Sequence, residues 1–510
     1  MHSQRPSVAI IGAGIAGLAA AVRLAASGYN VDVFEANAHP GGKLSQFSLG
    51  NYRFDFGPSL FTMPQYVDEL FSLAGENPRD HFNYHQLETV CHYWWEDGTQ
   101  LNAAAEVEVL AKECEEVLGV PQNRVLNFMR DAEHKYQTSG RTFLEKSLHQ
   151  ADTWLNLEVA RAMLKIPGLD LFTSMHKVHQ RDLQHPKLVQ LFDRFATYNG
   201  SNPYKAPGLL SMIPHFEHHF GAYLPNGGMY DISQSIYQLG QRLGVQYHFH
   251  TPVEEILTVE QKASGIRLAN GKQLSFDRVV CNMDVFFAYD RLLPQAKRPE
   301  RTLRQQKSTS AIIFYWGIQR QFPQLGVHNI LFSDDYQTEF ATLEAGGLSA
   351  DPTVYINISS KLVNDDAPEG GENWFVMVNA PPANGQDWPK MIAQLKDQVV
   401  AKVDRLVLQS SRVEVAQPKA VQPSSIKNYV QEERILGPAD LERLTGSHQG
   451  ALYGTSSNTP WAAFLRHPNF TRQIKDLYFL GGSVHPGGGV PLCLLSAKIV
   501  AELMKKRDSH

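Results

Sequence analysis

The sequence is poor in cysteine and carries little net charge. Its four cysteines show neither the spacing of metal ligands nor that of a redox pair, so a reducing compartment fits best. The net charge of −5, from 47 basic and 52 acidic side chains, gives no electrostatic reason to expect a nucleic-acid partner. The cysteines are Cys91, Cys114, Cys281 and Cys493.

Long apolar runs are also absent. No run reaches the roughly 18 residues that a membrane-crossing helix needs, so any contact with a membrane must be peripheral. The polar lead "MHSQRPS" passes directly into a strand-like run, and we expect no signal peptide and a cytoplasmic location. With 43% hydrophobic and 19% charged residues, the 510-residue chain has the composition of a globular protein of two or three units.

The first ordered unit reads as β-α-β. Ser7 to Ile11 is typical of a buried strand, Ile15 to Ser27 of an alanine-rich helix ended by Gly28, and Val31 to Glu35 of a second strand. The turn between the first strand and the helix carries the dinucleotide-binding spacing G-x-G-x-x-G, with Gly12, Ala13, Gly14 and Gly17.

Each part of this turn has a role in holding a dinucleotide. Gly14 lets the backbone approach a pyrophosphate, which lies at the positive helix N-terminus, and Gly17 lets the helix pack close to the strand. Glu35 follows about 20 residues later, where a carboxylate can accept hydrogen bonds from ribose hydroxyls. The ordinary alternative is a helix-to-sheet contact with a solvated Glu35.

The glycine motif alone does not distinguish NAD from FAD. The segments after it add further candidate residues for the cofactor site. "EANAHPGGKLSQF" places Ala36 beside the carboxylate and adds Gly42 and Lys43, a cation that can meet the phosphates from the other side. "FDFGPSLFTMP" follows, and its simplest interpretation is a β-turn before a helix. This second segment contains Gly57, Pro58 and Ser59.

Together, "GAGIAGLAAA", "GGK" and "FDFGPSLFTMP" resemble the start of a carotenoid desaturase of the bacterial phytoene desaturase type, within the flavin amine oxidase-like superfamily. The resemblance runs along the whole chain and implies FAD as cofactor. It also implies that Gly57, Pro58 and Ser59 belong to the cofactor site.

A helix and five short strands are expected between residues 230 and 281. Ile232, Ile236, Leu239 and Leu243 form an apolar helical stripe, and a β-meander with an Asn270-Gly271 turn follows. By resemblance, the backbone of Val253 contacts the adenine end of the cofactor; packing within a strand is the alternative. The five predicted strands are Val245 to Phe249, Pro252 to Thr258, Gly265 to Ala269, Gln273 to Phe276 and Arg278 to Cys281.

The resemblance implies an α/β fold of two discontinuous parts. A Rossmann-like FAD-binding domain, with a parallel sheet and the β-meander, comprises residues 1–85, 226–300 and 471–510. An inserted α+β substrate domain, with a mixed sheet and helices, comprises residues 86–225 and 301–470, and its strands include "SAIIFYWGI", "PTVYINISS" and "NWFVMVNAP".

The apolar substrate of this family implies a reversible membrane contact, which we expect in residues 150–225. Leu155, Val159 and Met163 share one helical face there, although such a stripe is more often part of a core. The nearby histidines have no flanking pattern of acids or cysteines, and the family uses no metal, so we expect no metal site. These histidines are His215, His218 and His219.

A second glycine-rich turn lies near the C-terminus, in "YFLGGSVHPGGGVPLCLLSAK". We expect Leu477 to Leu480 to be the last parallel strand, followed by a closing helix whose open N-terminus faces the flavin. The expected flavin contacts are Gly482, Ser483, Val490 and Pro491. Many members of the superfamily have an acid where this chain has Gly482-Ser483, which leaves the ribityl hydrogen bond unassigned.

His485 lies in the same turn, and its role stays open between a catalytic group and a histidine satisfied by the backbone. The resemblance implies that a CH₂–CH₂ unit of a polyene becomes a double bond, with hydride transfer to flavin N5 and loss of a proton to an unassigned acceptor. "FDFGPSLFTMP" favours the branch acting on hydroxylated or already unsaturated carotenoids, such as 1-hydroxycarotenoid 3,4-desaturases.

Two alternatives remain from the sequence. One is an enzyme that saturates, isomerises or oxygenates a polyene on the same architecture. The other is a lipid-carrying escort protein without chemistry, which the intact glycine turns and Glu35 disfavour. No feature of the sequence indicates an oligomeric state.

Overall fold

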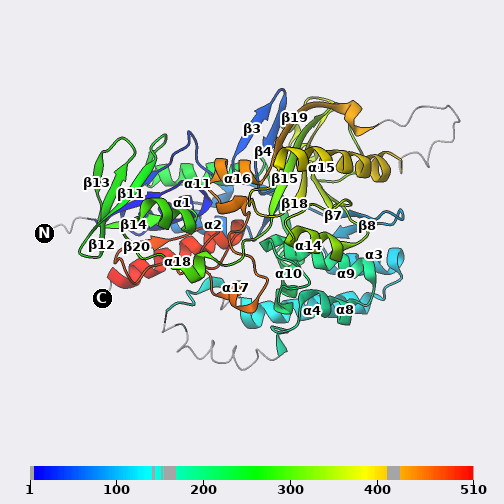
Figure 1. Ribbon diagram of the computed structural model, residues 1–510, viewed down its shortest axis with the longest axis horizontal. Coiled ribbons are helices and arrows are strands. Elements are labelled where there is room, and N and C mark those ends of the chain that lie inside the picture. Colours follow the sequence, from blue (N-terminus) through cyan, green and yellow to red (C-terminus); the bar gives the residue numbers. More distant parts are fainter. Residues whose placement is uncertain (1–4, 141–143, 151–152, 154–167, 410–424, 509–510) are drawn as a thin grey trace.

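Two β-sheets organise the molecule, one in each half (Figure 1). The computed structural model describes residues 5–140, 144–150, 153, 168–409 and 425–508. The first strand and the last helix lie in the same half, so the two ends of the chain build one side of the structure (Figure 1).

The first sheet is parallel and has the strand order β10-β2-β1-β14-β20. Its central strand is an unbroken apolar run, as expected where helices cover both faces of a sheet. The strands come from the start, middle and end of the sequence: β1 (Ser7–Ile11), β2 (Asn30–Phe34), β10 (Gln246–His248), β14 (Arg278–Cys281) and β20 (Leu477–Phe479). This sheet confirms the expected Rossmann-like architecture.

Helix α1 (Ile15–Ala26) packs against both α11 (Tyr230–Arg242) and α18 (Val490–Asp508). Its small, buried side chains allow this close approach on both flanks. The first and last helices of the chain therefore lie side by side (Figure 1).

The predicted meander is shorter than expected. Only β11 (Val253–Val259), β12 (Lys262–Leu268) and β13 (Gln273–Ser275) form the antiparallel sheet, and the flanking β10 and β14 belong to the parallel sheet. Short apolar runs do not reveal their pairing partner: β14 pairs with β1 and β20, and its Val279 packs against the face of the meander without joining it as a strand.

The second sheet is mixed, with the order β19-β15-β18-β17-β16-β7-β8. The β16–β7 pair is parallel and the other pairs are antiparallel. The three strands expected in the second half of the chain are all in it. Its strands are β7 (Thr89–Trp94), β8 (Gln100–Ala104), β15 (Ser310–Ile318), β16 (His328–Leu331), β17 (Val354–Asn357), β18 (Glu372–Ala380) and β19 (Val430–Leu436).

Helices cover the mixed sheet on two sides (Figure 1). Helix α15 (Trp388–Val403) packs its apolar residues onto strands β15 and β18, while a layer of helices packs onto β7 and β8. This layer includes α3 (Val107–Leu118), α4 (Gln122–Lys135), α8 (Met175–Leu183), α9 (Pro186–Asp193), α10 (Pro214–His218), α14 (Tyr336–Glu344) and the 3₁₀ segments η4 (Arg194–Asn199) and η5 (Gly208–Met212).

Shorter elements complete the fold. The strands are β3 (Gln46–Leu49), β4 (Tyr52–Asp55), β5 (Phe61–Thr62), β6 (Tyr84–Gln86) and β9 (Ala222–Pro225), and the helices are α2 (Gln65–Leu73), α12 (Val285–Phe287), α13 (Glu300–Leu303), α16 (Pro438–Thr445) and α17 (Pro460–Phe464). The predicted stripe of Leu155, Val159 and Met163 lies outside the described residues. Within the described part of the chain, no helix combines the length and apolarity that crossing a bilayer requires.

Candidate functional site

The first glycine turn has the geometry that its sequence predicts. Gly12 adopts a φ of +97°, which an L side chain disfavours, and a Cβ on Gly17 would overlap the carbonyl oxygen of Gly12. Helix α1 begins directly after Gly14 without any side-chain cap. Its N-terminal N–H groups are therefore available to an anion.

Glu35 is buried beside this turn rather than solvated. Its Oε2 accepts a hydrogen bond of 2.7 Å from the backbone N–H of Ala13, and its Oε1 accepts from the backbone N–H of Asn37 at 2.9 Å. The solvated alternative is thus wrong. The carboxylate stabilises the turn, and Ala36 next to it is exposed.

The second turn packs directly on the first. The backbone N–H of Gly41 donates to the carbonyl of Ala13 at 2.8 Å, and a Cβ on Gly42 would lie 3.4 Å from the Cα of Gly14. Lys43 is half-buried. Desolvation lowers the pKa of its amine, and its Nζ donates to the carbonyl oxygen of Leu452 at 2.9 Å. In this structure the cation therefore joins the two halves of the molecule.

The C-terminal glycine turn meets the first turn across one side chain, Asn282. The Nδ2 of Asn282 donates to the carbonyl oxygen of Gly12 at 3.3 Å, and a Cβ on Gly481 would lie 2.7 Å from its Oδ1. Sequence reasoning did not select Asn282. The sequence could have indicated it, because Asn282 directly follows the predicted strand Arg278 to Cys281. A polar residue in that position lies at the ligand-binding edge of a parallel sheet.

The remaining C-terminal candidates lie around this contact. Ser483 Oγ accepts from the backbone N–H of Val285 at 3.0 Å, and a Cβ on Gly482 would lie 3.3 Å from the Cα of Gly488. Val253 stands at the start of β11 and packs against the core beneath the parallel sheet. These residues do not line the apolar cavity that contains Ser59 and Val490 in its wall.

A largely apolar cavity of about 340 Å³ lies between the C-terminal glycine turn and the mixed sheet. Its apolar wall includes Leu60, Leu210, Ile213, Phe216, Ile313, Ile330, Phe375 and Met377. Six of the predicted cofactor residues also line it: Lys43, Gly57, Pro58, Ser59, Val490 and Pro491. The cavity therefore adjoins both the N-terminal and the C-terminal candidate segments.

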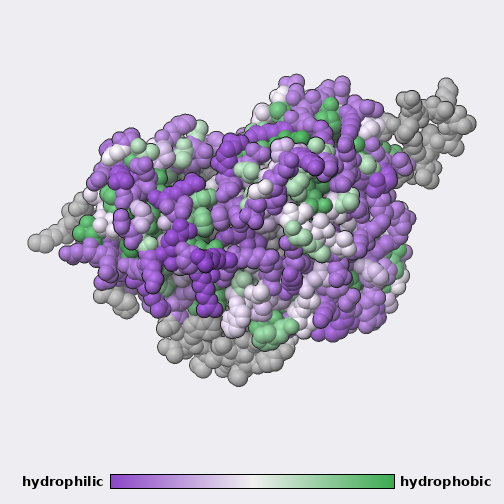
Figure 2. Space-filling model, viewed as in Figure 1, coloured by the Kyte–Doolittle hydropathy of each residue, from purple (hydrophilic) through white to green (hydrophobic). Residues whose placement is uncertain are grey.

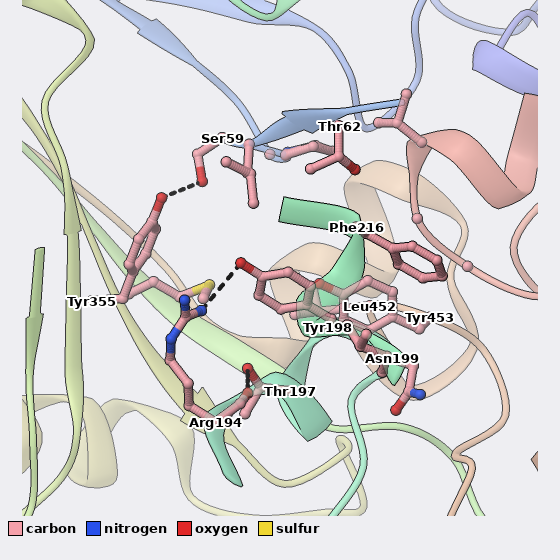
Figure 3. A pocket seen from close by; sticks show the side chains of 18 of the residues that line it. Ser59, Thr62, Arg194, Thr197, Tyr198, Asn199, Phe216, Tyr355, Leu452 and Tyr453 are labelled. Carbon is pink, nitrogen blue, oxygen red and sulfur yellow. Dashed lines mark hydrogen bonds between the residues drawn. The ribbon is translucent and has the colours of Figure 1, made fainter. Parts of the chain in front are cut away.

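Polar side chains interrupt the apolar wall on one side (Figure 3). Ser59 Oγ and the hydroxyl of Tyr355 are 2.7 Å apart, and this hydroxyl is also 2.7 Å from Nδ1 of His328. Burial lowers the pKa of His328 to about 3, so its ring is neutral.

A buried ion pair extends this polar region. Arg194 Nη2 donates to Glu217 Oε2 at 3.3 Å, while its Nε donates to the hydroxyl of Tyr93 at 2.6 Å. Figure 3 shows the guanidinium of Arg194 directed toward the hydroxyl of Tyr198, at 3.1 Å. Burial raises the pKa of Glu217, and the nearby Arg194 opposes this shift.

His485 is satisfied by the backbone. Its Nε2 donates to the carbonyl oxygen of Lys146 at 2.9 Å, and burial lowers its pKa to about 4, which keeps the ring neutral. Among the described residues, no group of three histidine, cysteine or acidic side chains is placed to hold a metal ion.

Comparison with known proteins identifies the family. The family described as flavin containing amine oxidoreductase matches residues 15–505. The chain belongs to this family. A 1-hydroxycarotenoid 3,4-desaturase from Flavobacterium sp. (strain P99-3) is 47% identical over 98% of this chain and 99% of the relative. A 4,4'-diapolycopene oxygenase from Methylomonas sp. is 30% identical over 97% of each chain.

Solved structures confirm the fold. An oxidoreductase from Methanosarcina mazei superposes with a TM-score of 0.62 over 97% of this chain and all of the other, at 13% sequence identity. Membership of the family makes this chain a flavin-dependent oxidoreductase. Its residues fit a flavin dinucleotide: the uncapped start of α1 suits a pyrophosphate, and open space beside Gly489 at the cavity leaves room for a planar ring.

Proposed function

We propose that this protein is an FAD-dependent carotenoid desaturase acting on a polyene with a hydroxylated end. The observation that carries the proposal is the apolar cavity, which adjoins Lys43, the Gly57-Pro58-Ser59 segment and the C-terminal glycine turn and includes polar groups in its wall. The full-length relative from Flavobacterium, named for desaturation of a 1-hydroxycarotenoid, supports this assignment.

The cofactor site combines the two ends of the chain. The pyrophosphate lies at the turn of Gly12, Ala13, Gly14 and Gly17, with Glu35 and Ala36 at the ribose and Val253 near the adenine. Residues 1–85, 226–300 and 471–510 form the FAD-binding domain, and residues 86–225 and 301–470 form the substrate domain. The remaining contacts are Gly42, Lys43, Gly57, Pro58, Ser59, Gly482, Ser483, Val490 and Pro491.

Flavin, when bound, supplies the acceptor for a hydride from the polyene. The chain's own contribution is to orient a nearly featureless hydrocarbon and to exclude water from it. Apolar walls for this purpose are provided by Phe216, Ile313 and Phe375. No carboxylate is needed to bind the hydrocarbon part of the polyene. The group that takes the proton is unassigned.

The test is a panel of three substrates: phytoene, neurosporene and a 1-hydroxycarotenoid. The purified flavin-loaded protein is incubated with each, and the absorption spectrum of the product is recorded. A red shift with the 1-hydroxycarotenoid is expected, because each added double bond lengthens the conjugated system. Absence of a red shift with all three substrates would falsify the desaturase assignment.

The panel also separates the alternatives. An oxygenase, the activity for which the Methylomonas relative is named, would give products that contain new oxygen, which mass spectrometry detects. A saturase would shift the absorption to the blue. An escort protein would bind the polyene unchanged and would purify without flavin.

Because an apolar polyene resides in a membrane, we propose that the enzyme is cytoplasmic and associates reversibly with a membrane surface. Large apolar side chains are exposed at Phe172 (85%), Trp461 (72%) and Leu465 (41%). In Figure 2 the visible face is mainly hydrophilic; hydrophobic residues are scattered over it, and a small group of them lies at its lower edge. Phe172 lies within the expected stretch 150–225, while Trp461 and Leu465 on and beside α17 lie outside it.

A further inference from the structure

Two buried polar atoms of the cavity wall lack a partner. Oε1 of Glu217 and Nε2 of His328 have no hydrogen-bond partner among the described residues, although both residues line the cavity. Glu217 is only 1% exposed and His328 only 4%. Leaving a buried polar atom unpaired is costly, so such atoms in a cavity indicate a ligand with matching polar groups.

The hydrogen bonds of His328 define which ring nitrogen carries the proton. Asn357 donates from Nδ2 to the carbonyl oxygen of Val327 at 3.0 Å, which fixes the orientation of its amide. The same Nδ2 lies 3.2 Å from Nδ1 of His328, so this nitrogen accepts a hydrogen bond. The neutral ring therefore carries its proton on Nε2, and the unpaired atom is a donor.

Glu217 supplies the complementary group. Its Oε2 accepts from Arg194, so the side chain is held as one half of an ion pair. Its Oε1 is consequently a free acceptor. An acceptor and a donor in one apolar cavity match an alcohol, which both donates and accepts a hydrogen bond.

The two groups belong to one compact region next to the predicted cofactor residues. His328 bonds to Tyr355, and Tyr355 bonds to Ser59 of the "FDFGPSLFTMP" segment. The charges of Arg194 and Glu217 also influence the pKa of Tyr355. The residues that carry the donor and the acceptor thus line the same cavity as Ser59.

We propose that Glu217 and His328 form a hydroxyl-binding subsite that holds the alcohol of the substrate close to the bond that reacts. This inference rests on the proposed function. In a 1-hydroxycarotenoid that is desaturated between C3 and C4, the carbon bearing the hydroxyl is two bonds from C3. A group that binds this hydroxyl must therefore lie beside the reacting carbons. The hydrogen bonds from His328 to Tyr355 and from Tyr355 to Ser59 put the subsite next to the predicted cofactor residues, where we expect those carbons to react.

The subsite also explains selectivity. A substrate without the hydroxyl leaves both polar atoms unpaired after water has been displaced, so the site disfavours it. A cavity that only recognised a hydrocarbon would need no such groups. The hydroxyl thus selects the substrate and fixes the position of the polyene along the cavity.

Variants of His328 provide the sharpest test. His328→Phe removes the donor. His328→Gln retains an N–H group, so it should keep much of the preference for the hydroxylated polyene that His328→Phe loses. Tyr355→Phe is the matched control, because it changes the same hydrogen-bonded region while leaving both unpaired atoms in place. Since removing Glu217 alone would leave the Arg194 charge unpaired, the acceptor is removed by the double replacement Arg194→Met/Glu217→Leu.

Two readouts are compared for a 1-hydroxylated polyene and the polyene of the same skeleton without the hydroxyl. One is kcat/KM of the flavin-loaded enzyme, and the other is equilibrium binding to anaerobically reduced holoenzyme, which cannot turn over. His328→Phe should lower kcat/KM and affinity about tenfold for the hydroxylated polyene alone, the effect of one lost hydrogen bond. Tyr355→Phe should change both polyenes alike.

Equal losses for the two polyenes in His328→Phe and in the double variant would overturn the subsite, since the groups would then be structural. The proposed function can fail separately. If the wild-type protein converts neither polyene but binds the hydroxylated one at least tenfold more tightly, the desaturase assignment falls and the subsite stands. Equal binding of both by the wild-type protein would contradict the subsite.

Discussion

The Nδ2 of Asn282 donates a hydrogen bond of 3.3 Å to the carbonyl oxygen of Gly12. Gly481, from the other end of the chain, approaches the same side chain so closely that its Cβ would lie 2.7 Å from Oδ1. One residue at the end of β14 therefore separates the N-terminal and C-terminal glycine turns. This residue holds the two turns in a fixed relation.

Replacing Asn282 should loosen this relation. Asn282→Ala removes one hydrogen bond of a partly buried side chain, which costs about 1 kcal/mol, and it leaves a gap between the two turns. We expect a lower Tm and less flavin per chain, measured from the ratio of flavin to protein absorbance. A variant with unchanged flavin content would show that Asn282 does not position the turns.

Gly17 offers a steric test with a matched control. A Cβ there would overlap the backbone carbonyl oxygen of Gly12. Because a backbone atom cannot move aside as the end of a flexible side chain can, Gly17→Ala should abolish flavin binding. Gly28 also has a positive φ, +89°, but a Cβ there meets nothing within 4 Å. Gly28→Ala should cost only about 1 kcal/mol of strain and keep its flavin. Equal flavin content in the two variants would count against the assigned turn.

Buried neutral histidines predict acid sensitivity. Burial lowers the pKa of His467 and His485 to about 4 and that of His328 to about 3, below the ordinary value near 6.5. Between pH 6.5 and 4 the unfolded chain binds protons that the folded chain does not, so the free energy of unfolding falls as pH falls. Each such histidine contributes a slope of about 1.4 kcal/mol per pH unit within this range.

His467→Asn isolates one of these contributions. The amide can still donate to the carbonyl oxygen of Pro468, as Nδ1 of the histidine is placed to do at 2.7 Å, but it does not titrate. Comparing the unfolding free energies of the variant and the wild-type protein from pH 8 to 4.5 cancels the other groups. The variant should have the shallower slope, and an identical slope would contradict the neutral state of His467.

Membrane association should depend on the exposed apolar residues Phe172, Trp461 and Leu465. Each large apolar side chain that enters the lipid contributes about 1.5–3 kcal/mol, so Phe172→Ser with Trp461→Ser should reduce the fraction that floats with liposomes. Val259→Ser, an exposed apolar position on the meander, is the control and should float like the wild-type protein. Wild-type protein that stays in the aqueous fraction would refute the proposed contact.

Local sequence patterns were sufficient for the first unit. The strand Ser7–Ile11, the glycine turn and Glu35 all depend on neighbouring residues, and the structure places the three together as predicted, although the burial of Glu35 was not foreseen. The boundaries of β14 were also predicted, but its partner was not. Pairing in a parallel sheet is decided by distant segments, and apolar periodicity carries no information about it.

The polar region of the cavity was not predicted. Arg194, Glu217, His328 and Tyr355 come from four separate segments, and only the folded chain brings them to one wall. In the sequence, the three histidines at 215–219 were considered as metal ligands. In the structure, the residue of this segment that pairs with Arg194 at the cavity is Glu217, which lies between them. Lys43 was expected at the phosphates, but in the structure it bonds to the carbonyl of Leu452, a contact between halves that no local pattern reveals.

The most direct test is an experimental structure of the flavin-loaded protein with a 1-hydroxylated polyene. The account predicts the pyrophosphate at the Gly12–Gly17 turn, the flavin ring between Ser59 and the start of α18, and the polyene in the cavity of about 340 Å³. A flavin bound away from either glycine turn, or a polyene bound outside this cavity, would contradict it.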